Sequence, residues 1–423
     1  MVDVTHTKDM LGRGGLCTVA QAQDVLAKHL NNIPILTEEI PLSEAFDRIL
    51  SEPIYSSEDL PAHPRSTMDG FAVKAADTFG ASESMPCYLN ITGEILMGQP
   101  PEGDVKKGCC YKIPTGGLCP DGADSVVMFE HTVPADDTML EVVKGVGAGT
   151  NLVQKGEDIA AKSEALPAGW RLRPQDIGLL AAIGVTTVAV TKKIRVGILS
   201  TGDEIINHTE KPLPGQIRNI NTLALCGLVR KAGGVYVDYG IVTDQKDIFL
   251  SAVKQAATEN DLVLFSGGSS VGVRDLGEQV IEKLGPPGIL VHGVKLKPGK
   301  PVIIGLSDNT PIFGLPGHPV SAMVCFDFFI KPAMRQLSGI PAKDHLPPSA
   351  VQAKLTRNIN SAAGRLDVIR VKLEESNSTW NAQPIMGKSG SISTLSRAHG
   401  YFLINEDAQG VSENSIVKVI LFQ

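Results

Sequence analysis

Between residues 193 and 337, short apolar runs alternate with longer amphipathic segments. The apolar runs predict strands at 194–199, 235–242, 261–265, 289–294, 302–305 and 311–313. The segments between and after them predict helices at 222–231, 245–258, 276–284 and 320–337. Such alternation predicts a doubly wound sheet of parallel strands, covered by helices on both faces.

The hydrophobic pattern differs on both sides of this region. Residues 18–30, 43–50 and 173–183 show helical spacing, with Thr18 and Gln21 placed as a capping box and Pro174 in a first turn. Short β-prone runs at 88–92, 110–113, 125–130 and 139–143 are broken by Gly, Pro and Asp, which indicates a small β-rich domain. Beyond a linker with several prolines, runs at 351–355, 367–373, 400–404 and 416–421 predict a second β domain.

The predicted fold is therefore a multidomain α/β protein with five segments along the chain. We expect a disordered tail at 1–17, a helical, elongated linking domain at 18–55 plus 157–190, and a β-rich inserted domain at 56–156. The doubly wound α/β domain spans 191–340, and a small C-terminal β domain spans 349–423. A chain of 423 residues with 43% hydrophobic residues is long enough for several cores.

Composition excludes several classes of protein. A net charge of −7 argues against general nucleic-acid binding, and no apolar run is long enough for a membrane span. The first residues lack the apolar stretch of a signal peptide, so we expect a cytoplasmic location. Seven cysteines without a Cys-x-x-Cys pair predict free thiols, and the absence of an H-E-x-x-H pattern argues against a zinc hydrolase.

Three turns after apolar runs carry groups that suit an anion. Glycine-rich segments at 266–270 and 314–317 follow predicted strands and precede helices, where backbone N–H groups point outward. Between them, Lys297 and Lys300 flank a stiff Pro-Gly turn and supply two compact positive charges. An ordinary glycine connection and a solvated turn are the alternatives for each motif alone. Together they predict one anion pocket at the carboxyl edge of the sheet.

Acidic residues also follow the strands. Glu204 and Asp244 come after two predicted strands, and Asp275 closes the glycine-rich segment after a third. Carboxylates together with phosphate oxygens and water suit Mg²⁺, so we expect a magnesium site bridging a phosphoanhydride. Helix capping is the alternative for each acid alone. In the inserted domain, Asp69 lies in a turn and Thr115 precedes two glycines, but neither pattern by itself predicts a functional site.

Taken in order, these motifs resemble the MoeA family, the molybdopterin molybdenumtransferases, over nearly the whole chain. The matching segments are MDGFAV at 68–73, PTGG at 114–117, STGDE at 200–204, SGGSSVG at 266–272, KPGKP at 297–301 and GLPGHPVSA at 314–322. The resemblance implies a MogA-like sheet domain and a homodimer whose site joins the sheet domain of one subunit to the inserted domain of the other. It implies insertion of molybdate into adenylylated molybdopterin, with Mg²⁺ present and AMP released.

The resemblance also implies roles for individual residues. Catalytic roles fall on Asp69, Glu204, Asp244 and Asp275, and the last three of these also bind Mg²⁺. Substrate-binding roles fall on Thr115, Ser266, Gly267, Gly268, Ser270, Lys297, Lys300, Pro301, Arg365 and Ser391. Ser389 is an alternative to Ser391. A MogA-like adenylyltransferase and recipient molybdoenzymes are the partners it implies.

The chain departs from the family pattern at several positions. His318 replaces the usual Asn, Ser269 a Val and Phe71 a Tyr, and Asn219 stands where a carboxylate is usual. These changes leave the charged set in place and bear on the choice between molybdate and tungstate. The remaining alternatives are an adenylyltransferase acting on the same pterin, a tungsten-specific insertase, and a non-catalytic dimeric scaffold.

Overall fold

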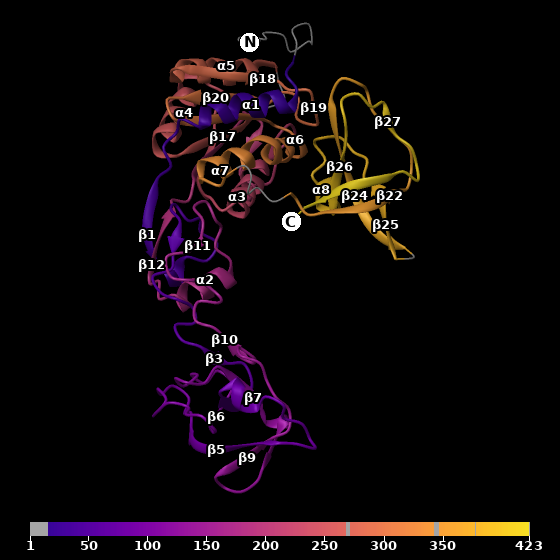
Figure 1. The fold of residues 1–423 in the computed structure, drawn as a ribbon. Helices are drawn as coiled ribbons and strands as arrows, with labels where there is room; N and C mark the ends of the chain where they lie inside the picture. Colours follow the sequence, from indigo (N-terminus) through magenta and orange to yellow (C-terminus); the bar gives the residue numbers. More distant parts are fainter. Residues whose placement is uncertain (1–15, 268–270, 342–346, 377, 423) are drawn as a thin grey trace. The chain divides into compact units, whose positions relative to one another are not determined.

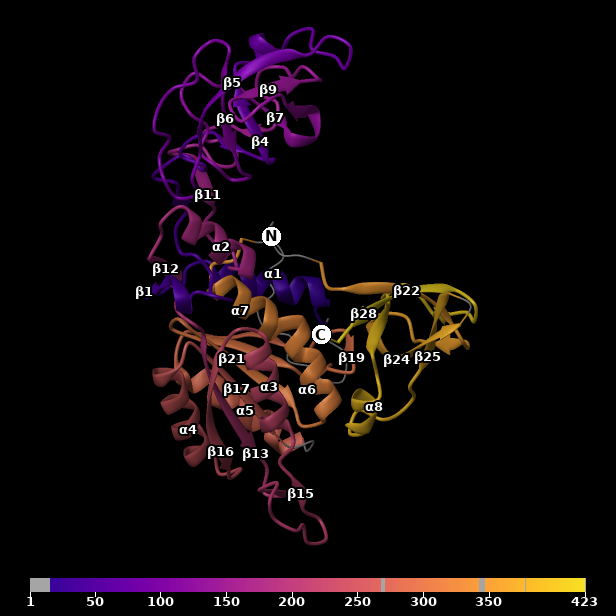
Figure 2. The ribbon, with the colours of Figure 1, turned by 90° about the horizontal axis from the view of Figure 1, so that it is seen from below.

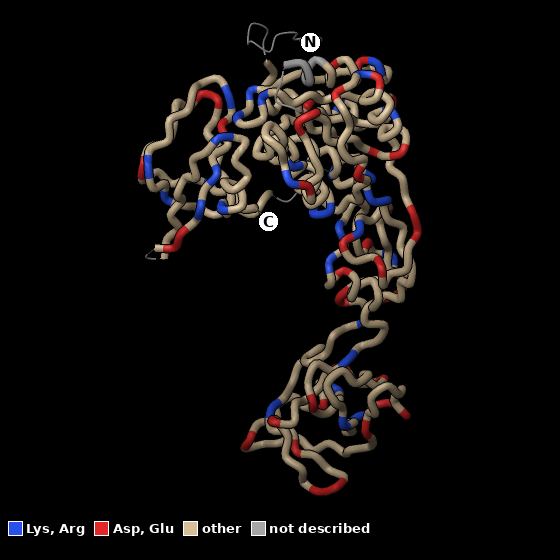
Figure 3. The backbone as a smooth tube through the Cα atoms, turned by 180° about the vertical axis from the view of Figure 1, so that it is seen from behind, with Lys and Arg blue, Asp and Glu red and all other residues tan. Residues whose placement is uncertain are grey.

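The chain folds into two compact units, each described here by itself. In the computed structural model, the described residues are 16–267, 271–341, 347–376 and 378–422, with backbone alone for 271–275. One unit comprises Met1–Glu38, Asp47–Ile49 and Val190–Gln423, and the other comprises Glu39–Phe46 and Leu50–Ala189. Figure 1 labels their helices and strands, and Figure 3 shows basic and acidic positions interspersed along both units.

A six-stranded sheet forms the centre of the larger unit, in the order β16-β13-β17-β21-β20-β18. Its strands are β13 (Arg195–Thr201), β16 (Val235–Val242), β17 (Leu262–Gly267), β18 (Pro287–His292), β20 (Ile303–Ser307) and β21 (Thr310–Pro316). The surrounding elements are α1 (Val19–Leu30), β14 (Ile205–Ile206), β15 (Ile217–Arg218), α3 (Asn221–Lys231), α4 (Lys246–Glu259), α5 (Val271–Leu284), α6 (Pro319–Cys325) and α7 (Lys331–Leu337).

The prediction of an all-parallel sheet is wrong for one strand. Strands β16, β13, β17 and β21 run parallel, whereas β20 is antiparallel to both β21 and β18. Ser307 pairs with Thr310, so only two residues join β20 to β21, and Asp308 adopts a positive φ of 50°. A two-residue connection forms a hairpin, because a parallel crossover needs a dozen residues or more.

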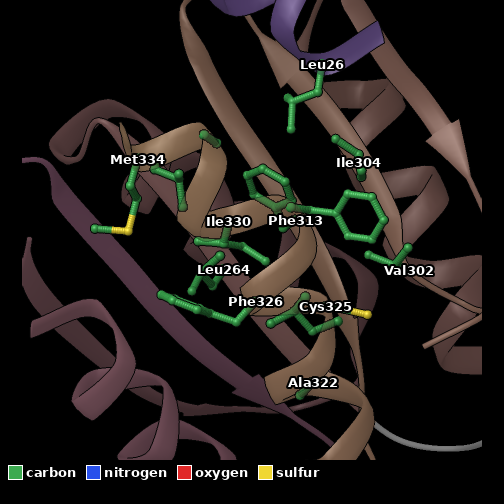
Figure 4. Packing of buried hydrophobic residues seen from close by; sticks show 14 of the residues in the cluster. Leu26, Leu264, Val302, Ile304, Phe313, Ala322, Cys325, Phe326, Ile330 and Met334 are labelled. Atoms are coloured by element: carbon green, nitrogen blue, oxygen red, sulfur yellow. The ribbon is translucent and has the colours of Figure 1, made fainter. Parts of the chain in front are cut away.

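Both faces of this sheet are buried, as the apolar strands predict. Along β17, Leu264 faces a core built with α1, α3, α6 and α7, while Val263 and Phe265 face a core built with α4 and α5. Figure 2 shows α3, α6 and α7 on one side of the strands and α4 on the other. Figure 4 shows Leu264 and Phe313 packed against Phe326 and Ile330 from the helical layer.

The helical predictions are mostly confirmed, with two corrections. At α1, Thr18 and Gln21 form the expected capping box. The helix expected at 320–337 is interrupted by a π-helical turn, Phe326–Ile330. Pro332 has no N–H for the Phe328 carbonyl, which instead accepts a hydrogen bond from Gln23 Nε2 at 2.7 Å.

The other correction concerns the helix expected at 43–50. Only a 3-10 turn, Leu42–Glu44, forms there. Asp47 adopts a φ of 66°, which no α-helix accommodates. The helix predicted at 43–50 from the spacing of its apolar residues is therefore an irregular segment beyond this turn.

The C-terminal part of the larger unit is a small closed sheet. Its order is β19-β24-β25-β22-β28-β26, and an additional pairing between β24 and β26 closes the ring. The elements are β19 (Leu296–Lys297), β22 (Ala350–Leu355), β23 (Ile359–Asn360), β24 (Leu366–Ser376), β25 (Thr379–Pro384), α8 (Ser393–Ser396), β26 (Gly400–Ile404), β27 (Gly410–Val411) and β28 (Ile416–Leu421). Because β19 belongs to the predicted lysine turn, backbone pairing joins that turn to this domain.

The smaller unit is built on a six-stranded sheet in the order β7-β4-β6-β5-β9-β8. These strands are β4 (Gly70–Val73), β5 (Cys87–Glu94), β6 (Cys109–Ile113), β7 (Ser125–Met128), β8 (Thr132–Pro134) and β9 (Met139–Val142). The remaining elements include β2 (Ile54–Tyr55), β3 (Arg65–Ser66), β10 (Leu152–Val153), β11 (Glu164–Leu166) and α2 (Pro174–Ala182), and β1 (Thr37–Pro41) pairs with β12 (Thr187–Thr191).

Two further sequence expectations can be compared with the structure. All seven cysteines are free, as predicted. Among the described residues, no helix is both long and apolar enough to cross a membrane.

Candidate active site

A cavity of about 600 Å³ lies at the carboxyl ends of β17 and β21. Its walls include Gly267 at the end of β17, residues 314–317 at the end of β21, and residues 297–301 of the lysine turn. The C-terminal domain contributes residues 364–365, 367–370 and 385–389. The lysine turn and the turn at 314–317 therefore meet the end of β17 in one cavity, and residues 268–270 of the third turn lie outside the described residues. Its volume suits a ligand of cofactor size.

The charged residues of the cavity wall are mainly basic. Among the described lining residues, the basic ones are Lys295, Lys297, Lys300, Arg365, Arg370 and Lys388, and the acidic one is Asp367. This charge is local, because the whole chain carries a net charge of −7. Lysine and arginine donors around a cavity favour an anionic ligand.

The lysine turn is positioned by its glycine. Gly299 has a φ of 129°, and a Cβ there would lie 2.9 Å from Leu296 Cδ2 and 3.0 Å from Cys325 Sγ. No side chain fits such a position. Gly299 therefore lets the turn pack closely on Leu296 and Cys325, and Lys297, Lys300 and Pro301 all line the cavity.

Arg365 and Lys297 share one carboxylate. Arg365 Nε donates to Asp367 Oδ1 at 2.8 Å, and Lys297 Nζ lies 3.5 Å from Asp367 Oδ2. The parallel pairing of β19 with β24 places Lys297 directly opposite Asp367. The structure thus brings together two predicted substrate-binding residues from different domains, with an acid that sequence reasoning did not single out.

Arg370 is the main feature of the cavity that sequence reasoning missed. It is 8% exposed, donates to Thr394 Oγ1 at 2.9 Å and to the Gly387 carbonyl at 3.0 Å, and its Nε has no hydrogen-bond partner. Burial lowers the pKa of its guanidinium, which nevertheless stays protonated. The available signal was an arginine between Ile369 and Val371 in an apolar strand, since charges are rarely buried there without purpose.

The two serine alternatives occupy different places. Ser389 lines the cavity, and its Oγ lies 2.8 Å from His318 Nδ1 at the start of α6. Ser391 is not among the described lining residues, and its carbonyl accepts a hydrogen bond from Thr394 Oγ1 at 2.7 Å. The geometry therefore favours Ser389 as the hydroxyl facing the cavity, held by the chain's unusual His318.

An acidic rim, defined here as Asp203, Glu204 and Asp244, follows β13 and β16 at the same edge of the sheet. Thr201 Oγ1 donates to Asp244 Oδ1 at 2.6 Å, and the Asp244 N–H points to Asp203 Oδ1 at 3.4 Å. Asp244 does not cap α4, whose N-cap is Gln245 without a side-chain hydrogen bond. The capping alternative is thus wrong for Asp244.

The rim alone does not form a complete metal site. Among the described residues, no group of three His, Cys, Asp or Glu side chains could hold a metal. The side chain of Asp275, and all of Gly268 and Ser270, lie outside the described residues. Mg²⁺ usually takes only one or two carboxylates beside substrate phosphates and water, so Glu204 and Asp244 suit a metal that arrives with a phosphate-bearing substrate.

A hydroxyl network joins the rim to the end of β17. Ser200 Oγ lies 3.4 Å from Ser266 Oγ and 2.8 Å from Thr222 Oγ1, and it donates to Asn219 Oδ1 at 3.1 Å. Asn219 thus fixes the hydroxyls where the family usually has a carboxylate. Ser266 is buried, so this network positions the strand end.

In the smaller unit, Asp69 and Thr115 form one motif. Asp69 Oδ1 accepts hydrogen bonds from the Thr115 N–H at 2.7 Å and from Thr115 Oγ1 at 3.0 Å. These hydrogen bonds lower the pKa of Asp69; the bond from the Thr115 N–H is the larger cause, and the bond from its hydroxyl is the next. Both residues are exposed, so the structure presents an ionised carboxylate on a rigid turn.

Three family models match successive parts of the chain. They are described as the MoeA N-terminal region (domain I and II) over residues 17–184, a "Probable molybdopterin binding domain" over 197–336, and the MoeA C-terminal region (domain IV) over 352–422. The central match contains the glycine-rich turns and the acidic rim. The C-terminal match contains Arg365 and Arg370.

Individual relatives agree with these matches. The chain is 36% identical over 396 residues to a molybdopterin biosynthesis protein of Methanocaldococcus jannaschii, covering 91% of this chain and 92% of the relative. It is 33% identical to the molybdopterin molybdenumtransferase of Haemophilus influenzae, covering 84% and 85%. A solved MoeA protein of Pyrococcus horikoshii superposes with a TM-score of 0.83 at 31% identity, covering 96% of this chain and 100% of that one. The chain therefore belongs to the MoeA family, the molybdopterin molybdenumtransferases.

Proposed function

We propose that this chain inserts molybdate into adenylylated molybdopterin with release of AMP. The observation that carries the proposal is the cavity of about 600 Å³, in which six basic side chains face one described acid. Molybdate is a tetrahedral dianion, and guanidinium, ammonium and hydroxyl donors suit its oxygens. The family membership supports a pterin substrate at the adjoining strand ends.

The residues divide into two sets in this proposal. Lys297, Lys300, Arg365 and Arg370, with the hydroxyl of Ser389 or Ser391, bind the oxyanion and hold it against the pterin. Glu204 and Asp244 at the rim, with Asp275, hold Mg²⁺ together with the substrate's phosphates. When bound there, Mg²⁺ stabilises negative charge on the phosphate leaving group. No side-chain nucleophile is required.

We further propose that the protein acts as a homodimer in the cytoplasm. Asp69 and Thr115 of one subunit would act at the cavity of the other, as the family resemblance implies. Their exposure and mutual hydrogen bonds support a role toward something outside their own unit. Light scattering should give about twice the chain mass, since most closed assemblies are two-fold. A stable, fully active monomer would contradict the shared site.

The decisive experiment mixes the purified chain with adenylylated molybdopterin, Mg²⁺ and molybdate. We expect AMP release together with molybdenum bound to the pterin, and loss of molybdenum incorporation when Mg²⁺ is chelated. Replacing molybdate by tungstate tests metal preference. Formation of adenylylated pterin from Mg-ATP and free molybdopterin would instead identify an adenylyltransferase. Absence of both activities would favour the scaffold.

A further inference from the structure

We propose that the Asp367 carboxylate is an internal anion that competes with the substrate oxyanion for Lys297 and Arg365. By this competition Asp367 sets how tightly the cavity holds a tetrahedral dianion. The inference rests on the proposed function, because it assigns a role within the same oxyanion cavity. It adds to those named above a residue that sets the affinity of the cavity for dianions.

The first support is the position of Asp367 within the cavity wall. The residue is 1% exposed, yet it lines the cavity from strand β24. Its Oδ1 accepts from Arg365 Nε at 2.8 Å, and its Oδ2 lies 3.5 Å from Lys297 Nζ. The single negative charge of Asp367 is therefore shared by two cavity cations, and it offsets part of their positive charge before any ligand arrives.

The second support is the difference in freedom between the acid and its two partners. The Asp367 side chain is 2% exposed, whereas that of Lys297 is 56% exposed and that of Arg365 is 37% exposed. Long, exposed side chains turn toward a new anion without any backbone movement, but a buried carboxylate does not retreat from it. An incoming oxyanion therefore takes Lys297 and Arg365 away from Asp367, and it is also repelled by the negative charge that remains on Asp367.

The third support is the contrast with Arg370 on the same strand. Arg370 is hydrogen-bonded to a hydroxyl and a carbonyl, and its Nε has no hydrogen-bond partner. A buried guanidinium held only by neutral groups favours an added anion. Among the basic residues of the cavity, Arg370 is thus a fixed cation for the ligand, whereas the attraction of Lys297 and Arg365 is reduced in advance by Asp367.

This arrangement has a functional consequence. Without the carboxylate, the cavity would attract any tetrahedral dianion strongly, including sulfate. With it, the net attraction of the cavity is smaller, so that binding at this site remains reversible. Repulsion between a dianion and a carboxylate at close range is worth about tenfold or more in affinity.

The test compares Asp367→Asn with wild type, using molybdate and sulfate titrations followed by calorimetry. Asn preserves the shape and removes the charge, so we expect both ions to bind about tenfold tighter or more. The salt dependence should also steepen, because more uncompensated charge faces the ligand. Glu375→Gln is the matched control, because it removes an exposed acid from the same strand outside the cavity lining.

If the ion pairs served only to hold Lys297 and Arg365 in place, Asp367→Asn would bind both anions more weakly, because the two cations would be disordered. Unchanged or weaker binding by Asp367→Asn overturns the proposal. If that variant does not fold, Arg365→Gln is compared with Arg365→Gln/Asp367→Asn, where removal of the acid should again tighten binding. Failure of wild type to bind either ion overturns the oxyanion cavity of the proposed function as well, which separates the two failures.

Discussion

The acidic rim and the basic cavity lie at the same edge of one sheet but carry opposite charge. The rim follows β13 and β16, and the cavity begins at the ends of β17 and β21. At the rim, Asp244 is held by a neutral threonine, so its charge stays available to a cation. In the cavity, Asp367 is held by two cations, so its negative charge is already paired with Lys297 and Arg365. Two carboxylates of the same type thus differ in the charge they offer to a ligand because of their immediate partners.

The largest effect should come from breaking the rim. Asp244→Asn removes a carboxylate proposed to hold Mg²⁺, and loss of such stabilisation costs several kcal/mol, or about a hundredfold or more in rate. We expect AMP release to fall by that factor while molybdate binding measured by calorimetry is unchanged. Asp247→Asn, an exposed acid in the first turn of α4, is the control. Equal losses of molybdate binding and AMP release in Asp244→Asn would show that the rim and the cavity do not act in separate steps.

The next effect should come from the cavity. Arg370→Gln removes a buried charge and should weaken molybdate binding by about one to two decades, since a charge-assisted contact is worth about 1.5–3 kcal/mol. Arg370→Lys keeps the charge but loses the planar guanidinium. Its molybdate affinity should therefore lie between those of wild type and Arg370→Gln. Thermal unfolding of each variant distinguishes lost binding from lost folding. Wild-type molybdate affinity in Arg370→Gln would exclude this residue from the site.

A smaller effect concerns Asp69 in the other unit. Its pKa is lowered in the folded protein, so its ionised form contributes stability above the unfolded pKa. That contribution should be lost as the pH falls through the lowered pKa, below the ordinary value of 3.8. Acid unfolding followed by circular dichroism should show wild type more stable than Asp69→Asn at neutral pH, with the difference vanishing in strong acid. A difference that persists there would mean that the charge is not the cause.

The smallest effect should come from His318→Asn, which restores the residue usual in the family. Asn keeps a hydrogen-bonding group toward Ser389, and a neutral hydrogen bond is worth only about 0.5–1.5 kcal/mol. We expect molybdate affinity to change by less than about threefold. Ser389→Ala removes a hydroxyl that is itself proposed to bind the oxyanion, so its molybdate affinity should fall further, by about one decade or more. A much larger effect in His318→Asn alone would assign His318 a direct contact with the substrate.

Much of the fold follows from local pattern. The spacing of apolar residues predicts the strands and helices of the α/β domain, because the central strands are buried on both faces and each helix on one. The capping box at Thr18 is readable from two residues. The antiparallel β20 and the π turn before Pro332 were missed, because each depends on a neighbour: a two-residue hairpin in one case and the Gln23 side chain in the other.

The sequence by itself determined the family, the order of the domains and the chemistry of the strand ends, because these depend on residue types at fixed spacing. Only the tertiary structure decided which charges act on one another. Lys297 and Asp367 lie 70 positions apart and meet through the pairing of β19 with β24. Whether a charge is neutralised, as in Arg365, or buried among neutral donors and acceptors, as in Arg370, depends on such long-range neighbours. Electrostatic energy varies with distance and burial, and sequence spacing specifies neither.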